Sequence, residues 1–370
     1  MKSLRLTMVM ALLVAAMTTV TARTDGQHLQ YVEGDSVELA DFFWNNLTGA
    51  VKQQYPDLKR ERRSNPSWSK SRLSRCVQEW DALWSQTELT GALIGQDGLE
   101  TREASAFHLA QLSEQLFLKT RDGRYGDALE RTLYNELAGA VYTSGQSAVR
   151  RQACEIIGRV RDLIYAFDRD NLYVNLHVRS EAHIKSSGLD LHLSLLGSMP
   201  WYNRMMLVLK MPADSQHLTV HIRVPAWIEG QTIPAAGGME KMKYKVYVNG
   251  QPIAPKIEKG FLVIDSVWQK DNSITLDFRT PILRIITPRH PDQMALQRGA
   301  LVFSLQNMSP QLSINTGDKI SSRFDKDRHT LVLSSQCYDA QGAVAGEYEA
   351  VPYFWSPERN WSSVYVPAKP

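Results

Sequence analysis

The sequence predicts an α+β multidomain protein in which a helical region is followed by β-sandwich domains. Between residues 70 and 166, apolar residues recur every three or four positions, which is typical of helices packed on a core. From about Asp168 onward, short runs alternate apolar and polar residues and are separated by turn residues, which is typical of the strands of a sandwich. The length of 370 residues allows two or three domains.

Residues 1–22 have the pattern of a secretory signal. Lys2 and Arg5 precede an apolar stretch over residues 6–20, and Val20-Thr21-Ala22 offers small residues for cleavage. The stretch is short for a bilayer core of about 30 Å. We therefore expect a secreted or periplasmic protein that has no membrane attachment after the signal is cleaved.

Charge and cysteine content exclude several classes of partner. The formal net charge of +3 falls to about +1 without Lys2 and Arg5, so nothing favours binding to nucleic acid. The three cysteines are too widely spaced for a disulfide framework or a metal motif. His217 and His221 are four apart, but they lie in a strand pattern, which separates them by about 13 Å. That distance is too large for one metal ion.

Helices are expected at several places in the first half of the chain. Residues 23–79 form an unassigned helical or loop segment, in which 37–47 favours a helix. Further helical periodicity covers 73–84, 104–120, 125–141 and 149–167. Arg121-Asp122-Gly123 ends the second of these helices, with Gly123 suited to a left-handed position. Short turns between them suggest antiparallel helical hairpins.

Strands are expected through the rest of the chain. Asn249-Gly250 predicts a hairpin, because these residues favour the two positive φ angles of a type I′ turn. Other turns are marked by Ser187-Gly188, Lys259-Gly260 and Asp271-Asn272. Predicted strands cover residues 172–178, 189–195, 205–210, 218–224, 244–248, 261–264, 274–278, 300–305, 330–333 and 364–366.

An ordered series of short motifs runs from about Trp80 to Pro370. The helical part holds Trp80-Asp81, Thr90-Gly91-Ala92-Leu93-Ile94-Gly95 and the run from Gly123 to Asn135 (GRYGDALERTLYN). The strand part holds Leu172-Tyr173-Val174-Asn175-Leu176, Pro200-Trp201-Tyr202-Asn203, Ile222-Arg223-Val224-Pro225-Ala226-Trp227, Gln297-Arg298-Gly299-Ala300-Leu301-Val302 and Val351-Pro352-Tyr353-Phe354-Trp355-Ser356. In this order and spacing they resemble glycoside hydrolase family 127, the β-L-arabinofuranosidase type.

The resemblance implies a catalytic (α/α)6 barrel followed by β domains, acting on arabinose-containing glycans. It also implies a cysteine thiolate as nucleophile, held near a zinc ion that cysteines and a glutamate bind, with a second glutamate as general acid/base. Zinc ligation suits this chemistry because it lowers the pKa of a thiol. Residues 80–168 would be the barrel remnant, 169–290 the middle β-sandwich domain and 291–370 the C-terminal β domain.

The cysteines that the resemblance requires are absent from their expected positions. The family's Glu-Thr-Cys motif falls on Arg102-Glu103-Ala104, or on Glu100-Thr101-Arg102 in a shifted register. Its cysteine pair falls near Ala148-Val149, one helical turn before Cys154. Zinc ligands are therefore not matched, and no cofactor is expected. Cys154, Glu100 and Glu103 are the remaining catalytic candidates. The alternatives are a buried apolar role for Cys154 and a solvated or capping role for the glutamates.

The helical region is also too short for a closed barrel. Six helical hairpins need roughly 200 residues or more, whereas residues 23–166 number 144. The sequence therefore predicts only a partial (α/α)6-barrel-like region. Its exposed apolar face must pack on the β domains, on residues 23–79, or on a partner chain or second copy.

Two functions fit these observations. The first is a secreted carbohydrate-active protein of the family 127 type with a degenerate or incomplete catalytic site. The second is a non-catalytic carbohydrate-binding or accessory protein that uses only the sandwich. Trp355 and Trp361 lie among charged neighbours and are the candidate sugar-stacking residues. An active hydrolase using Cys154 and a nearby glutamate is a third, weaker hypothesis.

Overall fold

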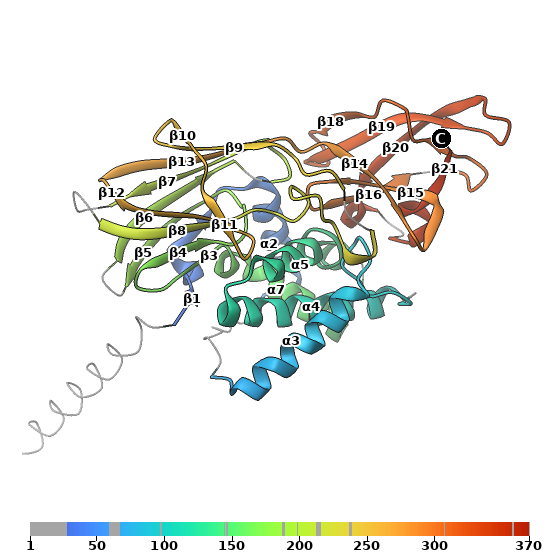
Figure 1. The fold of residues 1–370 in the computed structure, drawn as a ribbon. Helices are drawn as coiled ribbons and strands as arrows, with labels where there is room; N and C mark the ends of the chain where they lie inside the picture. Colours follow the sequence, from blue (N-terminus) through green and yellow to red (C-terminus); the bar gives the residue numbers. More distant parts are fainter. Residues whose placement is uncertain are drawn as a thin grey trace, which may run out of the picture.

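A computed structural model describes residues 28–58, 67–96, 98–143, 145, 147–186, 189–197, 199–211, 216–236, 239–306, 308–356 and 359–369. The predicted signal over residues 1–22 lies outside them. The fold mixes helices with three sheets, and Figure 1 shows the helices beneath two neighbouring groups of strands. No helix in the described ranges combines the length and the apolar character that crossing a membrane requires.

Helix α4 (Leu99–Thr120) lies at the centre of the helical region, where it packs against α3, α5 and α7. Helix α3 lies along its outer side (Figure 1). The helical elements are α2 (Phe42–Gln54), α3 (Lys70–Ser85), α5 (Gly123–Thr132), the π-helical turn η2 (Leu133–Leu137), α6 (Ala138–Tyr142), α7 (Ala148–Gly158) and the 3-10 turn η3 (Val160–Leu163).

The junction between α4 and α5 differs in detail from the prediction. Arg121, not Gly123, adopts the left-handed conformation (φ 55°) that ends α4. Asp122 then caps α5 by accepting a hydrogen bond from the backbone N–H of Arg124 (3.0 Å). Gly123 begins α5, and a Cβ there would lie 3.0 Å from the carbonyl oxygen of Lys259. The glycine thus permits close packing on a strand turn.

Two sheets form the middle of the protein, and the N-terminal segment contributes a strand to each. One has the order β1-β3-β4-β8-β12-β11 and the other β10-β9-β13-β7-β6-β5-β2. The first comprises β1 (Gln30–Tyr31), β3 (Tyr165–Phe167), β4 (Asn171–Val174), β8 (Gln216–Arg223), β11 (Lys256–Glu258) and β12 (Phe261–Trp268). The second comprises β2 (Val37–Leu39), β5 (Ser180–Ser186), β6 (Leu189–Leu196), β7 (Arg204–Lys210), β9 (Tyr244–Val248), β10 (Gln251–Ile253) and β13 (Asp271–Phe278).

Alternating apolar and polar residues determine which face of each strand is buried. In β6, Leu189, Leu191, Leu193 and Leu195 are buried, and the intervening side chains are not. The inner faces of both sheets share one apolar core with α2, α6 and α7. The Asn249-Gly250 turn has both φ angles positive, at 49° and 78°. This confirms the predicted hairpin, which joins β9 to β10.

A third sheet forms the C-terminal part, with the order β17-β21-β15-β16-β20-β19-β18 and β14 paired to β15. Its last strand follows two short helical turns, η5 (Tyr353–Trp355) and α8 (Trp361–Val364). The strands are β14 (Ile282–Thr287), β15 (His290–Arg298), β16 (Leu301–Gln306), β17 (Ile314–Asn315), β18 (Ser321–Asp325), β19 (Thr330–Tyr338), β20 (Val344–Pro352) and β21 (Val366–Lys369). The remaining short turns are η1 (Gly34–Ser36) and η4 (Pro234–Ala236).

Candidate functional site

Cys154 lies on α7 with its side chain fully buried in the main apolar core. Burial, together with the nearby carboxylates of Glu103 and Glu155, raises the pKa of this thiol to about 12. A nucleophilic or metal-binding cysteine needs the opposite shift, because the thiolate is the reactive form. The thiol of Cys154 is therefore protonated at neutral pH.

The two candidate glutamates have different environments. Glu100 is exposed in the first turn of α4, where a carboxylate interacts favourably with the helix N-terminus. Glu103 is fully buried one turn later. Its Oε1 accepts a hydrogen bond from Arg359 Nη2 (2.5 Å), and its Oε2 lies 3.6 Å from Arg150 Nε. Glu103 is thus held between two guanidinium groups.

A second buried carboxylate, Glu136, lies in the π-helical turn η2. Its Oε1 accepts hydrogen bonds from Thr90 Oγ1 (2.8 Å) and from the Tyr353 hydroxyl (3.0 Å). Arg102 Nε lies 3.7 Å from the same oxygen, and Arg359 Nη1 lies 3.9 Å from Oε2. Burial raises the pKa of Glu136, and the charges of Arg359 and Arg102 oppose that shift. Sequence reasoning missed Glu136, although it directly follows the GRYGDALERTLYN motif.

Glu103, Glu136, Arg102, Arg150 and Arg359 together form what we call the buried ion network. Arg359 connects it to the C-terminal part, since its own carbonyl accepts a hydrogen bond from Arg102 Nη2 and its Nη2 donates to the Thr143 hydroxyl. A Cβ at Gly139 would lie 2.3 Å from Arg359 Nη1, so α6 must present a glycine there. The network therefore fills the space between α4, α6, α7 and the loop before α8.

The buried ion network includes Arg102 and Glu103, onto which the spacing of the motifs places part of the zinc site that the resemblance implies. Contact between Arg150 and Glu103 brings residues 102–104 of α4 close to the start of α7, where Ala148 and Val149 lie. Neither segment supplies a thiol. Glu103 already faces two cations, which repel a metal ion, and the nearest cysteine has a raised pKa. These residues do not fit a thiolate–zinc centre.

The motif that precedes Glu136 holds the helices to the middle sheets. Arg223 of β8 is fully buried and donates to Asp127 Oδ1 (2.5 Å) and Glu130 Oε1 (2.9 Å) on α5. Burial raises the pKa of Asp127 to about 6, against the charge of Arg223. A Cβ at Gly126 would lie 2.6 Å from Arg223 Cδ. These residues of the motif thus pack the interface between α5 and β8.

Comparison with known proteins connects this fold to one family. Residues 171–280 match the sequence model described as the middle domain of GH127, β-L-arabinofuranosidase. A GH127 β-arabinofuranosidase structure superposes with a TM-score of 0.68 at 18% identity, covering 90% of this chain and 60% of that one. Residues 171–280 thus resemble the GH127 middle domain, and the whole fold resembles that of a GH127 structure.

Two further structures share the fold. A GH127 β-L-arabinofuranosidase from Geobacillus stearothermophilus T6 gives a TM-score of 0.67 at 18% identity, covering 90% of this chain and 61% of that chain. A glycoside hydrolase gives 0.63 at 14% identity, with 91% and 68% covered. No curated protein sequence is significantly similar. The GH127-like chain thus spans about 60% of the length of the two GH127 structures.

The two candidate tryptophans lie on either side of the loop that carries Arg359. Trp355 is half-buried and stacks on Tyr142 with ring centroids 4.8 Å apart and planes 17° apart. Trp361 is also half-buried, and its ring centroid lies 5.2 Å from the guanidinium carbon of Arg102. Trp361 therefore packs on the buried ion network, whereas Trp355 forms an aromatic pair with the partly exposed Tyr142.

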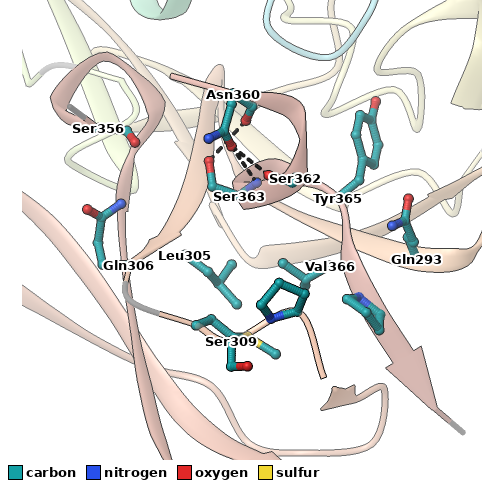
Figure 2. Close-up of a pocket in the computed structure, with 13 residues that line it drawn as sticks. Gln293, Leu305, Gln306, Ser309, Ser356, Asn360, Ser362, Ser363, Tyr365 and Val366 are labelled. Atoms are coloured by element: carbon teal, nitrogen blue, oxygen red, sulfur yellow. Dashed lines mark hydrogen bonds between the residues drawn. The ribbon is translucent and has the colours of Figure 1, made fainter. Parts of the chain in front are cut away.

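A cavity of about 390 Å³ lies between α8 and the third sheet (Figure 2). Its wall is made of amide, hydroxyl and apolar side chains, and every described lining residue is uncharged. Asn360 caps α8 at the rim, with its Oδ1 accepting hydrogen bonds from the Ser363 N–H (2.9 Å) and the Ser362 hydroxyl (3.0 Å). The lining residues are Gln293, Leu305, Gln306, Met308, Ser309, Pro310, Ser356, Asn360, Ser362, Ser363, Tyr365, Val366 and Pro367.

Proposed function

We propose that this GH127-like chain binds a carbohydrate without hydrolysing it by the thiol–zinc route of the family. The observation that carries the proposal is the buried ion network, which occupies positions where the resemblance implies zinc ligands. Forming a zinc centre there would remove the carboxylate of Glu103 from Arg150 and Arg359 and leave buried cations uncompensated, which is costly. A thiolate at Cys154 would in addition face the negative charges of Glu103 and Glu155.

Carbohydrate binding is supported by the cavity beside α8. Sugar hydroxyls are uncharged donors and acceptors, and the neutral amide and hydroxyl lining of this cavity matches them. Its volume of about 390 Å³ falls within the range of about 300–1,000 Å³ that is typical of small-ligand sites. Trp361 and Trp355 adjoin the lining residues Asn360 and Ser356 in sequence, but neither tryptophan lines the cavity. By its family relationship, the proposed ligand is an arabinose-containing glycan.

The proposal includes a finer architecture, a location and a partner. The helices would be the remnant of an (α/α)6 barrel, and the two middle sheets a β-sandwich. Residues 1–22 would direct export to the periplasm or the exterior. A partner chain or second copy would cover the part of the core-facing side of α3 that α4 leaves open, where five apolar side chains stay only partly buried: Leu73, Cys76, Val77, Leu83 and Trp84. Light scattering during gel filtration tests this last point, since a monomer would contradict self-association.

Two assays on the purified chain test the main proposal. Hydrolysis of a chromogenic arabinofuranoside and zinc content are measured for the wild type and for Cys154→Ala. We expect no turnover and no zinc that depends on Cys154. Calorimetric titration with an arabino-oligosaccharide should show binding that Asn360→Ala weakens, with His217→Ala as a distant exposed control.

The competing hypothesis is an active hydrolase that uses Cys154 with Glu103. Its one favourable observation is proximity, since Glu103 on α4 lies close enough to the Cys154 thiol on α7 to affect its pKa, although the effect is to raise it. Turnover that disappears in Cys154→Ala, together with loss of bound zinc, would replace the proposal by this hypothesis. Absence of any glycan binding would contradict the carbohydrate-binding part alone.

A further inference from the structure

The β5–β6 hairpin places two histidines and an aspartate together on its outer face. His183 on β5 and His192 on β6 are direct cross-strand partners, and their rings stack with centroids 3.8 Å apart and planes 14° apart. Asp190 lies two residues before His192 on the same strand, and its Oδ1 is 2.8 Å from His183 Nε2. One ligand atom from each of these three residues lies within 4.8 Å of the others.

Strand alternation fixes this arrangement. The alternate residues Ala182, Ile184, Leu191 and Leu193 are buried in the core beneath the hairpin. Because successive side chains point to opposite faces, His183, Asp190 and His192 must all point outward. The direct pairing of residue 183 with 192 makes the contact between His183 and Asp190 a diagonal one. The backbone of both strands is hydrogen-bonded within a seven-stranded sheet, so it is rigid.

We propose that His183, Asp190 and His192 bind a divalent transition-metal ion of the Zn²⁺ or Cu²⁺ class. Imidazole nitrogens with one carboxylate are a preferred donor set for these ions. In a tetrahedral site with bonds of about 2.0–2.1 Å, donor atoms lie roughly 3.3 Å apart. The donors here, spaced up to 4.8 Å, reach that spacing by rotating partly exposed side chains, without moving the strands. Three protein donors leave a coordination position open to solvent.

The surroundings of this trio both help and oppose a cation. The adjoining surface depression, of about 590 Å³, is lined by the carboxylates of Asp35, Glu38 and Glu181 and by two cations, Arg161 and Lys185. Lys185 Nζ lies 3.8 Å from Asp190 Oδ2 and so competes with a metal ion for that carboxylate. Removing the charge of Lys185 should therefore strengthen metal binding.

Another His–Asp pair in the same protein provides a matched control. On β8, His217 Nε2 lies 2.8 Å from Asp265 Oδ1, and both side chains are exposed. This pair makes the same contact as His183 and Asp190, but among the described residues it has no third metal-binding side chain beside it. His217→Ala should leave metal binding unchanged.

The test is calorimetric titration of the full chain with Zn²⁺, repeated with Cu²⁺ and with Mg²⁺. We expect one saturable Zn²⁺ site, tighter binding of Cu²⁺ and no binding of Mg²⁺. His183→Ala and His192→Ala should each weaken Zn²⁺ binding at least tenfold, and Lys185→Met should tighten it severalfold. Circular dichroism checks that each variant keeps its fold, as expected for outward-facing side chains.

Cys154→Ala separates this site from the thiol–zinc centre considered above. Zinc binding that survives Cys154→Ala and is lost in His192→Ala supports the proposal and leaves the proposed function untouched. The proposal is overturned if zinc does not bind saturably up to millimolar concentration. It is equally overturned if His183→Ala and His192→Ala bind zinc as the wild type does, or if Lys185→Met binds it no more tightly.

Discussion

Replacing Arg359 by methionine would test the buried ion network directly. The side chain of Arg359 is 2% exposed, and methionine keeps much of its length while removing the charge. The substitution removes the only cation that lies within 4.0 Å of both Glu103 and Glu136 among the described residues. Both carboxylates remain fully buried, so they cannot recover the lost interaction from water.

The expected cost follows from the partners that remain. Removing one member of a buried ion pair typically costs about 3–5 kcal/mol, because the other charge is left uncompensated. Glu103 keeps Arg150 at 3.6 Å and Glu136 keeps Arg102 at 3.7 Å. The loss of stability in Arg359→Met should therefore lie at the lower end of this range, at about 3 kcal/mol. That loss lowers the ratio of folded to unfolded protein by roughly 100-fold.

Urea unfolding followed by tryptophan fluorescence measures this effect. The control is Arg323→Met, which removes an exposed guanidinium that pairs with Asp325 and Glu349 and should change stability little. Glu103→Gln should cost less stability in the Arg359→Met background than in the wild type, because Glu103 has then already lost one of its two cationic partners; coupling of about 0.5–3 kcal/mol is expected. The reasoning is refuted if Arg359→Met is no less stable than Arg323→Met. It is also refuted if the stability changes of Arg359→Met and Glu103→Gln simply add in the double variant.

Three further predictions concern packing, pH and thiol reactivity. Gly126→Ala should destabilise the protein by about 1–3 kcal/mol, because its Cβ would lie 2.5 Å from a side-chain oxygen. Gly49→Ala has open space within 4 Å and should stabilise α2 by about 0.5–1 kcal/mol, and thermal unfolding compares the two variants. Burial lowers the pKa of His221 to about 4 from 6.5, so the unfolded chain binds the proton more readily and stability should fall as pH falls from about 6.5 to 4. His221→Gln should lack this part of the pH dependence in urea unfolding at both ends of that range, and an identical profile would contradict the assignment. A thiol-specific reagent at pH 8 should label the half-buried Cys76 quickly and the buried Cys154 only on unfolding. Fast labelling of Cys154 in the folded protein would be inconsistent with its burial and raised pKa.

Local sequence patterns predicted much of the secondary structure. The helical period in residues 73–84 corresponds to α3, and the alternation in 244–248 corresponds to β9. The Lys259-Gly260 turn adopts two positive φ angles, 47° and 78°, as Asn249-Gly250 does. These features depend on neighbours in sequence, so a short window contains the information that determines them.

Long-range features were not predictable in the same way. Strand β2 pairs with β5 across more than 100 residues, and nothing in residues 37–39 indicates that partner. Arg359 follows Pro357-Glu358 and resembles a solvated residue in sequence, yet it is buried against Glu103, 256 positions away. Glu136 similarly gains its burial from Tyr353 and Thr90. Tertiary contacts, not local preference, decide such positions.

The hydrogen bonds that reach from the C-terminal loop to the helices have a consequence for biosynthesis. The hydrogen-bond partner of Glu103 is Arg359, which is synthesised 256 residues later. The partner of Glu88 is the hydroxyl of Tyr365, which is synthesised 277 residues later. At about 5–20 residues per second, a ribosome needs roughly 13–50 s to supply Arg359 after Glu103. Throughout that interval the nascent helices carry acidic groups that cannot yet be enclosed. Translation must therefore have passed Tyr365 before the helical region can adopt its final packing.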